Sequence, residues 1–501
     1  MVGNSIFHHT VSRHPEFLTV PPPGGPPGPT GLLDASTSAA ALAVAAEVAA
    51  RVADPARVAR LVAVAAAQTA HPTSVHWRNH AVGQGHAGLA LLFGALDHHL
   101  PGEGWDRAAH HHLALAARAA EGLARPPAGL FAGLAGIGLV ASCLSGDGSR
   151  YRRLLATIDQ ALVARTPDLV GALDGPARWG RDVTGGSEPG RSERKAVAGA
   201  RPGGSAGGQA VREFDLISGL AGVGAYLLLR RAEPGPAAAL RAVLDRLVEL
   251  TGSDAAGPRW RTPPDALSPD ERTRYPNGYL NCGLAHGIPG PLAVLALALR
   301  DGIEIPGLAE AVATTAAWVA THRVDVPSGP NWPNAVPLPD RPVGAPAAAG
   351  SPEGEGGARA AWCYGGPGVA ASLRLAGEAL GQPGHRDLAA AALSAALARP
   401  AGERRTDSPA FCHGQAGLLA VTATFARSTG APALRRATTA LAADLLDQFD
   451  PAAPLGYRDL EAGGRAIDQS GLLTGAPGVA LALLSATSPT EPDWGRLFLL
   501  A

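Results

Sequence analysis

The sequence predicts an all-α protein, an α/α toroid (a double-layered α/α barrel) of seven helical-hairpin repeats. Ala- and Leu-rich runs such as residues 35–52 and 386–398 carry the strongest helix formers at helical spacing. Aromatic residues make up only 5% of the chain, and β-branched runs are scarce. A Gly-x-x-Gly element followed by an apolar run recurs about every 65 residues, which is long enough for two helices and their connections.

The glycine pairs divide the chain into similar units. Each pair precedes an apolar run, so we expect it at the start of a helix, where glycine permits a tight turn and close approach of the backbone. Stacked hairpins form either an open superhelix or a closed ring. Closure is expected, because neither terminal unit has the polar outer face of a capping repeat. The seven copies begin at Gly85, Gly133, Gly219, Gly287, Gly365, Gly414 and Gly475.

Three segments stand apart from this repeat. Residues 1–35 include the stretch VPPPGGPPGPTG and are expected to form an arm ahead of a toroid domain over residues 36–501. Residues 184–209 are rich in Gly, Ser and charged residues, which leaves little apolar surface to bury. Residues 326–357 form a long Pro/Gly-rich stretch just ahead of the fifth glycine pair. We expect both of these stretches to be flexible insertions.

The composition limits the classes of function. The chain carries 42 basic and 43 acidic residues, which argues against a basic surface for nucleic acid or for an anionic membrane. Four cysteines in 501 residues are too few for a disulfide framework. The N-terminal residues lack an apolar signal core, and no uninterrupted apolar run approaches the roughly 20 residues of a membrane span. We therefore expect a soluble, cytoplasmic protein, in which cysteines serve metals or catalysis more often than disulfides.

Reactive side chains gather just ahead of four consecutive glycine pairs. Cys363 and Cys412 each lie two residues before a pair, and His413 follows the second cysteine. His286 directly precedes another pair, and Asp215 lies four residues ahead of the pair before that. In a closed ring, equivalent positions face a common centre at the same end. These side chains are therefore expected to converge.

Two thiols and an imidazole that converge on one point predict one zinc ion per chain, held by Cys363, Cys412 and His413. Structural zinc sites normally have four protein ligands, whereas catalytic sites keep one position open, so a set of three ligands indicates catalysis. Taken singly, each cysteine would more often be a small buried apolar residue. The shared frame and the adjacent histidine favour the metal.

Other candidates have plainer interpretations. Cys143 lies in an apolar stretch and is expected to pack in the core, and Cys282 is expected to be a bystander thiol. The run of histidines at 110–112 lies on a charged helix, where a solvated face is expected. Taken alone, Asp215 fits a helix N-cap and His286 a hydrogen-bonded core histidine. As pre-glycine residues of one ring, both become candidates for acid/base chemistry.

Three motifs in combination carry a resemblance to a known family. They are GLAHGIPG (283–290), WCYGGPG (362–368) and FCHGQAGLL (411–419). From about residue 36 onward the chain is similar to the LanC family, the lanthionine cyclases of class I lanthipeptide biosynthesis. The resemblance implies the α/α toroid and a zinc ion on the three ligands named above.

By the same motif matching, the resemblance implies that Asp215 and His286 are an essential acid/base pair and that Arg359 and Tyr364 belong to the active site. The implied substrate is a precursor peptide with dehydroalanine or dehydrobutyrine and free cysteines. A substrate thiol would lose its proton at zinc and add to the β-carbon. His286 would then protonate the α-carbon near neutral pH, with Asp215 orienting it and Arg359 stabilising negative charge. The sequence leaves open which member of the pair handles which proton.

The resemblance also implies partners: a dehydrated lanthipeptide precursor, a lanthipeptide dehydratase and an export transporter, which would bring the protein to the membrane periphery. A stand-alone cyclase is expected, rather than a dehydratase–cyclase fusion. Two alternatives stay open. One is the addition of a small thiol such as glutathione to dehydroamino acids, as in the family's eukaryotic relatives. The other is a non-catalytic scaffold that holds a modified peptide for a dehydratase, and the intact set of acid/base and ligand residues weighs against it.

Overall fold

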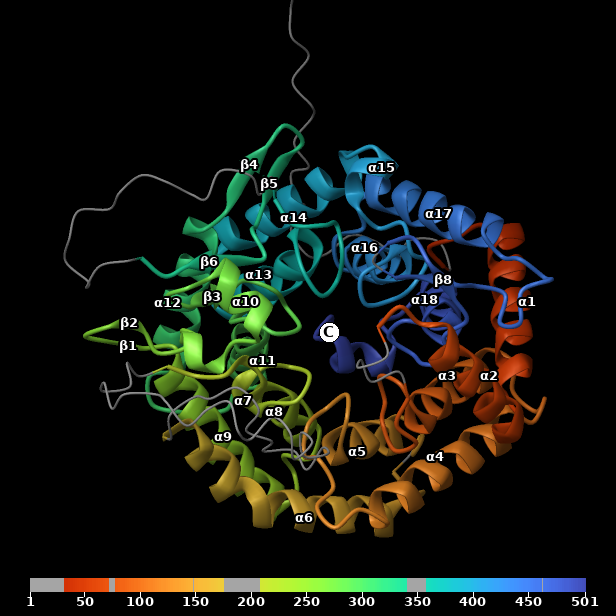
Figure 1. Cartoon of the computed structure of the whole chain (residues 1–501), viewed down its shortest axis with the longest axis horizontal. Coiled ribbons are helices and arrows are strands. Elements are labelled where there is room, and N and C mark those ends of the chain that lie inside the picture. The colour runs from red at the N-terminus through yellow and green to blue at the C-terminus, as the bar shows by residue number, and fades with distance from the viewer. Residues whose placement is uncertain (1–30, 72–76, 147, 175–207, 340–356, 462) are drawn as a thin grey trace, which may run out of the picture.

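The computed structural model describes residues 31–71, 77–146, 148–174, 208–339, 357–461 and 463–501. Within them, helices form two concentric layers around a central axis (Figure 1). The inner layer consists of α3 (His86–His99), α5 (Leu134–Cys143), α8 (Leu220–Leu229), α11 (Pro289–Arg300), α13 (Gly366–Ala379), α16 (Gln415–Thr429) and α18 (Ala476–Thr487). The outer layer consists of α4 (Trp105–Glu121), α6 (Arg152–Gly171), α9 (Pro234–Leu250), α12 (Leu308–Thr321), α14 (Pro383–Ala398), α17 (Pro432–Asp447) and α1 (Ala35–Val52).

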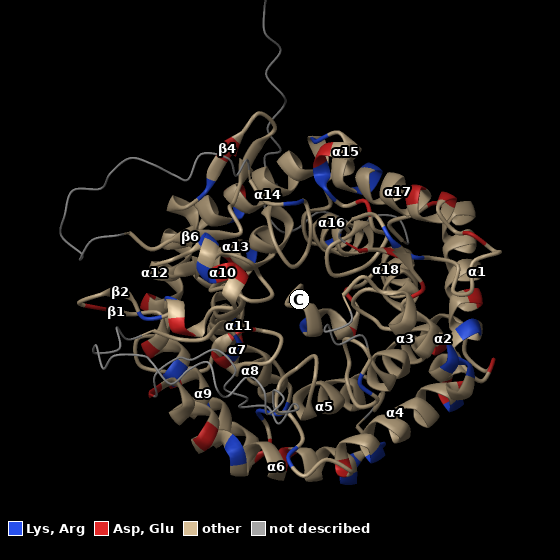
Figure 2. Ribbon diagram, in the orientation of Figure 1, with Lys and Arg blue, Asp and Glu red and all other residues tan. Residues whose placement is uncertain are grey.

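The two layers differ in sequence pattern because they differ in what covers them. The inner helix α8 is buried from Leu220 to Leu228, as expected of a helix that is apolar all round. The outer helix α9 buries Leu240, Val243, Leu244 and Leu247, which lie on one face. Figure 2 shows the charged residues concentrated on the outer helices and on loops, with few on the inner layer. The predicted all-α toroid is confirmed.

Each inner helix begins one or two residues after the first glycine of its pair, so the second glycine lies in the first turn, where it is needed for close packing. At Gly417 an added Cβ would overlap the carbonyl oxygen of Phe411 and press against Cβ of Trp362 in the preceding unit. The second glycine of the other pairs meets the corresponding carbonyl oxygen of its own unit. The glycines therefore let each helix start lie directly against its own entry loop and the neighbouring unit.

A belt of backbone hydrogen bonds closes the ring. Its members lie at the entries to successive inner helices, and the N–H of each unit donates to a carbonyl of the next. The last bond, from Leu473 to Gly83, joins the seventh unit to the first at 2.9 Å. In order, the bonds run from Gly83 to Phe131, Phe131 to Ile217, Leu216 to Ala285, Ala285 to Cys363, Cys363 to Cys412, Cys412 to Leu473 and Leu473 to Gly83. The open superhelix is therefore excluded.

Helix α1 completes the outer layer from the other end of the chain, since it packs on α18 and touches α17. Among the described residues, α1 is the one helix long and apolar enough to cross a membrane, by length and composition only. Its buried residues, including Ala41, Ala45, Val48 and Val52, lie on one side of the helix. Contact with the ring accounts for this apolar face.

The remaining elements lie in the connections between these helices, except η4, which belongs to the C-terminal segment. The helical ones are α2 (Pro55–Gln68), α7 (Val211–Phe214), α10 (Pro269–Arg274), α15 (Ala401–Arg404) and the 3-10 turns η1 (Ala172–Asp174), η3 (Pro264–Ala266) and η4 (Asp493–Phe498). The antiparallel strand pairs are β1 (Ser253–Asp254) with β2 (Gly257–Pro258), β3 (Tyr279–Asn281) with β6 (Ala335–Pro337), β4 (Val324–Val326) with β5 (Gly329–Asn331), and β7 (Asp459–Leu460) with β8 (Ala466–Ile467).

The segments predicted to be flexible have different outcomes. Nearly all of residues 1–35 and 184–209 lies outside the described residues. Residues 326–339, expected to begin a flexible insertion, form strand pairs instead. The prediction fails there because Asn331 and Trp332 are buried and β6 pairs with β3. Residues 340–356 lie outside the described part.

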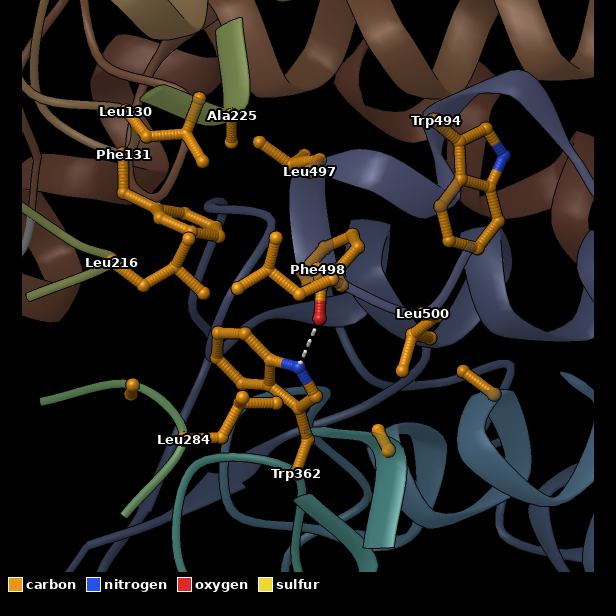
Figure 3. Close-up of a cluster of buried hydrophobic side chains, with 14 of the residues drawn as sticks. Leu130, Phe131, Leu216, Ala225, Leu284, Trp362, Trp494, Leu497, Phe498 and Leu500 are labelled. Carbon is orange, nitrogen blue, oxygen red and sulfur yellow. Dashed lines mark hydrogen bonds between the residues drawn. The ribbon is translucent and has the colours of Figure 1, made fainter. Parts of the chain in front are cut away.

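The C-terminal segment from Asp493 onward, called the C-terminal plug below, fills the centre of the ring (Figure 1). Phe498 stacks on Phe411 with ring centroids 3.9 Å apart, and its carbonyl accepts a hydrogen bond from the Trp362 indole at 2.9 Å. Phe131 and Leu216 lie in the same cluster (Figure 3). Trp362 and Phe411 immediately precede Cys363 and Cys412, so the C-terminal plug supports the two segments that carry the cysteines.

Candidate functional site

The reactive residues lie in the loops that enter α8, α11, α13 and α16. The belt of hydrogen bonds makes these loops neighbours, since Ala285 donates to Cys363 and Cys363 donates to Cys412. A cavity of about 1090 Å³ lies against them, and Arg359, Cys363, Tyr364 and His413 are among its lining residues. The sequence-predicted convergence is therefore a direct result of ring closure.

Cys363 and Cys412 are hydrogen-bonded to each other through their side chains. This bond, together with the charges of His413 and Arg359, lowers the pKa of the Cys363 thiol to about 7, against the opposing effect of burial. The same bond, together with burial, raises the pKa of Cys412. The pair therefore loses its first proton near neutral pH and holds its second more tightly.

His413 is held by a carboxylate from a loop 46 residues away. Its Nε2 lies 3.2 Å from Oδ1 of Asp459, and the same oxygen accepts a hydrogen bond from the Ser408 hydroxyl at 2.6 Å. The bond to Asp459 raises the pKa of His413. With Nε2 turned to Asp459, Nδ1 is the ring nitrogen that can serve a metal.

The donor set fits zinc in kind. Two adjacent thiols, one of them readily ionised, and an imidazole oriented by a carboxylate are the ligand types that zinc prefers. In the described part of the chain, however, no group of three or more His, Cys, Asp or Glu side chains is already arranged to hold a metal ion. Cys363, Cys412 and His413 are the residues that could do so.

Asp215 and His286 form a hydrogen-bonded pair beside the thiols. His286 Nδ1 lies 2.6 Å from Oδ2 of Asp215, whose side chain is 1% exposed. The other carboxylate oxygen accepts from the backbone N–H groups of Ser218 and Gly219, in the turn that leads into α8, whose N-cap is Gly219. Asp215 therefore has a structural part in this turn, and its acid/base role stays a prediction.

Opposing effects act on the pKa of His286. Burial acts to lower its pKa, but the hydrogen bond and charge of Asp215, with a smaller contribution from Cys363, raise it above the ordinary value. Its side chain is 40% exposed, and its ring centroid lies 6.5 Å from that of Tyr364. With Nδ1 engaged, Nε2 is the nitrogen available for proton transfer to a ligand.

Tyr364 and Arg359 complete the cluster. Burial raises the pKa of Tyr364, so the phenol stays protonated at neutral pH. Asn281 donates a hydrogen bond to its hydroxyl oxygen at 3.0 Å. Arg359 lowers the pKa of both Cys363 and Cys412 through its positive charge. All seven sequence-predicted site residues thus lie in one cluster, and their chemical roles stay predictions.

Sequence reasoning missed three residues of the cluster: Asn281, Ser408 and Asp459. None lies within three residues ahead of its glycine pair, and the carboxylate of Asp459 comes from β7, outside the repeat frame. The prominent carboxylate in DLEAGG (459–464) was an available signal, but nothing in the sequence connects it to His413.

The remaining cysteines and histidines have structural environments. Cys282 is buried and its pKa is raised to about 12 by burial, as expected of a bystander thiol. Burial likewise raises the pKa of Cys143 to about 12. The predicted solvated face at residues 110–112 is wrong for His112, which is fully buried with Nδ1 3.1 Å from Nδ1 of His86. The helix turns this one member of the run inward, against α3.

Comparisons with known proteins agree with this geometry. Residues 76–499 match the family model described as lanthionine synthetase C-like protein. The nisin biosynthesis protein NisC of Lactococcus lactis subsp. lactis is 28% identical over 219 residues, which cover 43% of this chain and half the length of that protein. The solved structure of nisin cyclase matches with a TM-score of 0.66 at 20% identity, over 88% of this chain and 97% of that one. At this identity, the structural match speaks for the fold.

Proposed function

The chain belongs to the lanthionine synthetase C-like family, and from that premise we propose that it is a zinc-dependent lanthipeptide cyclase. In this reaction, cysteine thiols of a precursor peptide add to dehydroalanine or dehydrobutyrine and form lanthionine or methyllanthionine rings. The observation that carries the proposal is the hydrogen-bonded thiol pair of Cys363 and Cys412 beside the Asp215–His286 pair. One pair suits a thiol-binding metal, and the other suits proton transfer.

The donor residues define what a metal would contribute. A zinc ion on Cys363, Cys412 and His413 would supply a position at which a substrate thiol loses its proton near neutral pH. Asp459 holds the imidazole of His413 so that one ring nitrogen stays directed away from the carboxylate. Arg359 adds positive charge beside the thiols and favours an incoming thiolate.

The addition balances without any further reagent. The thiolate sulfur forms a bond to the β-carbon of the dehydro residue, and the electron pair of the C=C bond moves toward the α-carbon and its carbonyl oxygen. A proton then returns to the α-carbon, so the product has the mass of the reactant. His286 suits that delivery, because Asp215 accepts from Nδ1 and raises the pKa of the imidazole, which favours its protonated form.

The cavity supports a peptide substrate. Its volume of about 1090 Å³ exceeds the needs of a single side chain, and both acidic and basic residues line it. We propose a dehydrated lanthipeptide precursor as the substrate, and a dehydratase that supplies it as a functional partner. A cytoplasmic location, with an export transporter that draws the protein to the membrane periphery, completes the proposal.

Metal analysis tests the ligand assignment. Purified protein is expected to carry about one zinc per chain, and Cys363→Ala and Cys412→Ala are expected to lose it. Cys282→Ala is the matched control, because that thiol is buried and its sulfur contacts the carbonyl oxygen of Leu280, and it is expected to keep its metal. Full zinc content in either ligand variant would overturn the assignment.

A second experiment separates proton delivery from metal binding. His286→Ala is expected to keep its zinc but to cyclise a dehydrated peptide about 10²–10⁴-fold more slowly, because a positioned acid is lost. Since cyclisation is mass-neutral, remaining free thiols are counted by alkylation. Wild-type turnover in this variant would refute the acid role. Addition of glutathione to the peptide, seen as a mass increase, would instead favour a small-thiol transferase.

A further inference from the structure

Asn281 lines the wall of the cavity, and its side chain contacts a predicted active-site residue. It is the last residue of β3 and is 5% exposed. Its Nδ2 donates to the hydroxyl oxygen of Tyr364 at 3.0 Å, and its Oδ1 accepts from the backbone N–H of Gly283 at 2.9 Å. Nothing in the repeat pattern marks this residue.

The backbone fixes the orientation of the Asn281 amide. A peptide N–H can only donate, so the atom that faces Gly283 must be the carbonyl oxygen of the side chain. The amide nitrogen is thereby directed at Tyr364. The assignment of nitrogen and oxygen, which is often ambiguous for Asn, is set here by chemistry.

The orientation of Asn281 decides what Tyr364 can do. Because the phenol oxygen accepts from the amide, its own O–H must point elsewhere. Within the described residues, no hydrogen bond donated by that O–H is found, and Tyr364 lines the cavity. Neighbouring Tyr279 differs, since its hydroxyl donates to Glu271.

The ring of Tyr364 is held as firmly as its hydroxyl group. A Cβ added to Gly283 would lie 2.6 Å from two atoms of the ring, so the ring rests directly on this glycine's backbone. Gly283 therefore supports the ring of Tyr364, and Asn281 donates a hydrogen bond to its hydroxyl oxygen.

We propose that Asn281 is a positioning residue that holds Tyr364 as a hydrogen-bond donor to the carbonyl oxygen of the dehydro residue. Negative charge collects on that oxygen when the thiolate adds to the β-carbon, and a fixed donor stabilises it. The inference rests on the proposed cyclase function. Removal of one such donor typically costs about 10²–10³-fold in kcat, which is the scale expected for loss of the Tyr364 hydroxyl.

Asn281→Asp tests the proposal with almost no change in shape. One carboxylate oxygen still accepts from Gly283, but the other now accepts from Tyr364 and turns the phenol O–H away from the substrate. We expect kcat to fall about as far as in Tyr364→Phe, with KM little changed, because the lost interaction forms as the charge develops.

A double-mutant cycle removes the effect of the added charge. In the Tyr364→Phe background, Asn281→Asp is expected to cost nothing further in turnover, since Asn281 is proposed to act on the substrate through the Tyr364 phenol. If Asn281→Asp lowers kcat further in the Tyr364→Phe background, the proposal is wrong. It is also wrong if Asn281→Asp alone turns over at the wild-type rate. Should the aspartate variant fail to fold, Asn281→Ala in the same cycle gives the same two readings.

A spectroscopic measurement separates this inference from the proposed function. With ¹³Cζ-labelled tyrosine, the signal missing in Tyr364→Phe identifies Tyr364, and it is expected to shift in Asn281→Asp as the phenol changes from acceptor to donor. An unmoved signal would contradict the local geometry. If the wild-type protein fails to cyclise a dehydrated peptide while the Tyr364 signal still shifts in Asn281→Asp, the proposed function is wrong but the positioning of Tyr364 by Asn281 stands.

Discussion

At the scale of single residues, Asp459 is the clearest addition to the site. Its carboxylate accepts from His413 Nε2 and Ser408 in a buried position. A carboxylate behind a ligating histidine fixes the ring and strengthens the ligand, and its loss typically weakens metal binding about 10–100-fold. Asp459→Asn is therefore expected to bind zinc at least about tenfold more weakly, measured by competition with a chromophoric chelator.

The control for this prediction is Asp407→Asn, which removes a carboxylate from the lining of the same cavity. If the effect came from the overall charge of the cavity, both variants would lose affinity equally. Asp459→Asn with wild-type affinity would show that His413 needs no orienting partner.

The buried pair of His86 and His112 predicts a pH-dependent stability. Burial lowers the pKa of each to about 4, and in the unfolded chain a histidine titrates near 6.5. Between these values the unfolded state binds more protons, so the free energy of unfolding falls as pH falls, by up to about 1.4 kcal/mol per pH unit for each histidine.

Urea unfolding at pH 7 and pH 5 measures this loss. His112→Gln removes one of the two titrating groups and is expected to lose less stability between the two conditions than the wild type. His110→Gln, on the exposed side of the same helix, is the control and is expected to follow the wild type. An unchanged pH dependence in His112→Gln would rule out this source.

At the scale of elements, the second glycine of each pair limits how closely an inner helix meets its neighbours. Gly417→Ala would place a methyl group against the carbonyl oxygen of Phe411 and Cβ of Trp362, where backbone must move to make room. Overpacking of this kind is expected to destabilise the protein by about 1–3 kcal/mol, read from denaturant unfolding.

Gly384→Ala is the matched control. This glycine lies in the first turn of α14, with nothing within 4 Å of an added Cβ. Alanine is the better helix former, so a neutral effect or a gain of up to about 1 kcal/mol is expected there. Equal tolerance at both glycines would show that the inner helices have room that the packing does not reveal.

At the scale of the whole molecule, the C-terminal plug couples the stability of the ring to the site. Phe498 stacks on Phe411 and receives the Trp362 indole hydrogen bond at its carbonyl. Phe498→Ala is expected to cost about 3–5 kcal/mol of stability. It is also expected to weaken zinc binding, because Trp362 and Phe411, which contact Phe498, directly precede the two cysteines.

Phe93→Ala distinguishes this coupling from general destabilisation. Phe93 of the inner helix α3 is equally buried, but it packs against Trp105 and His112 of the outer helix α4. A similar loss of stability with unchanged zinc affinity is expected. If the two variants bind zinc alike, the plug stabilises the fold without positioning the ligands.

Local sequence was sufficient for much of this architecture. Helix type follows from Ala and Leu at helical spacing, and the seven helix starts follow from the glycine pairs. The same frame placed Cys363, Cys412, His413 and His286 together, because residues at equivalent points of a repeat occupy equivalent points of a ring. Arg359 and Tyr364 were implied by the family resemblance, and they too line the cavity.

Only the tertiary structure decided the rest. Closure depends on the bond from Leu473 to Gly83 and on the contact of α1 with α18, which join opposite ends of the chain. Asp459 reaches His413 from 46 residues away, and Asn281 reaches Tyr364 from 83. A repeat is a local signal that the sequence states seven times, whereas a contact between two distant loops occurs once and depends on how the whole ring packs. For that physical reason, the sequence determined the helical units and the reactive side chains, and the fold alone determined the partners that orient them.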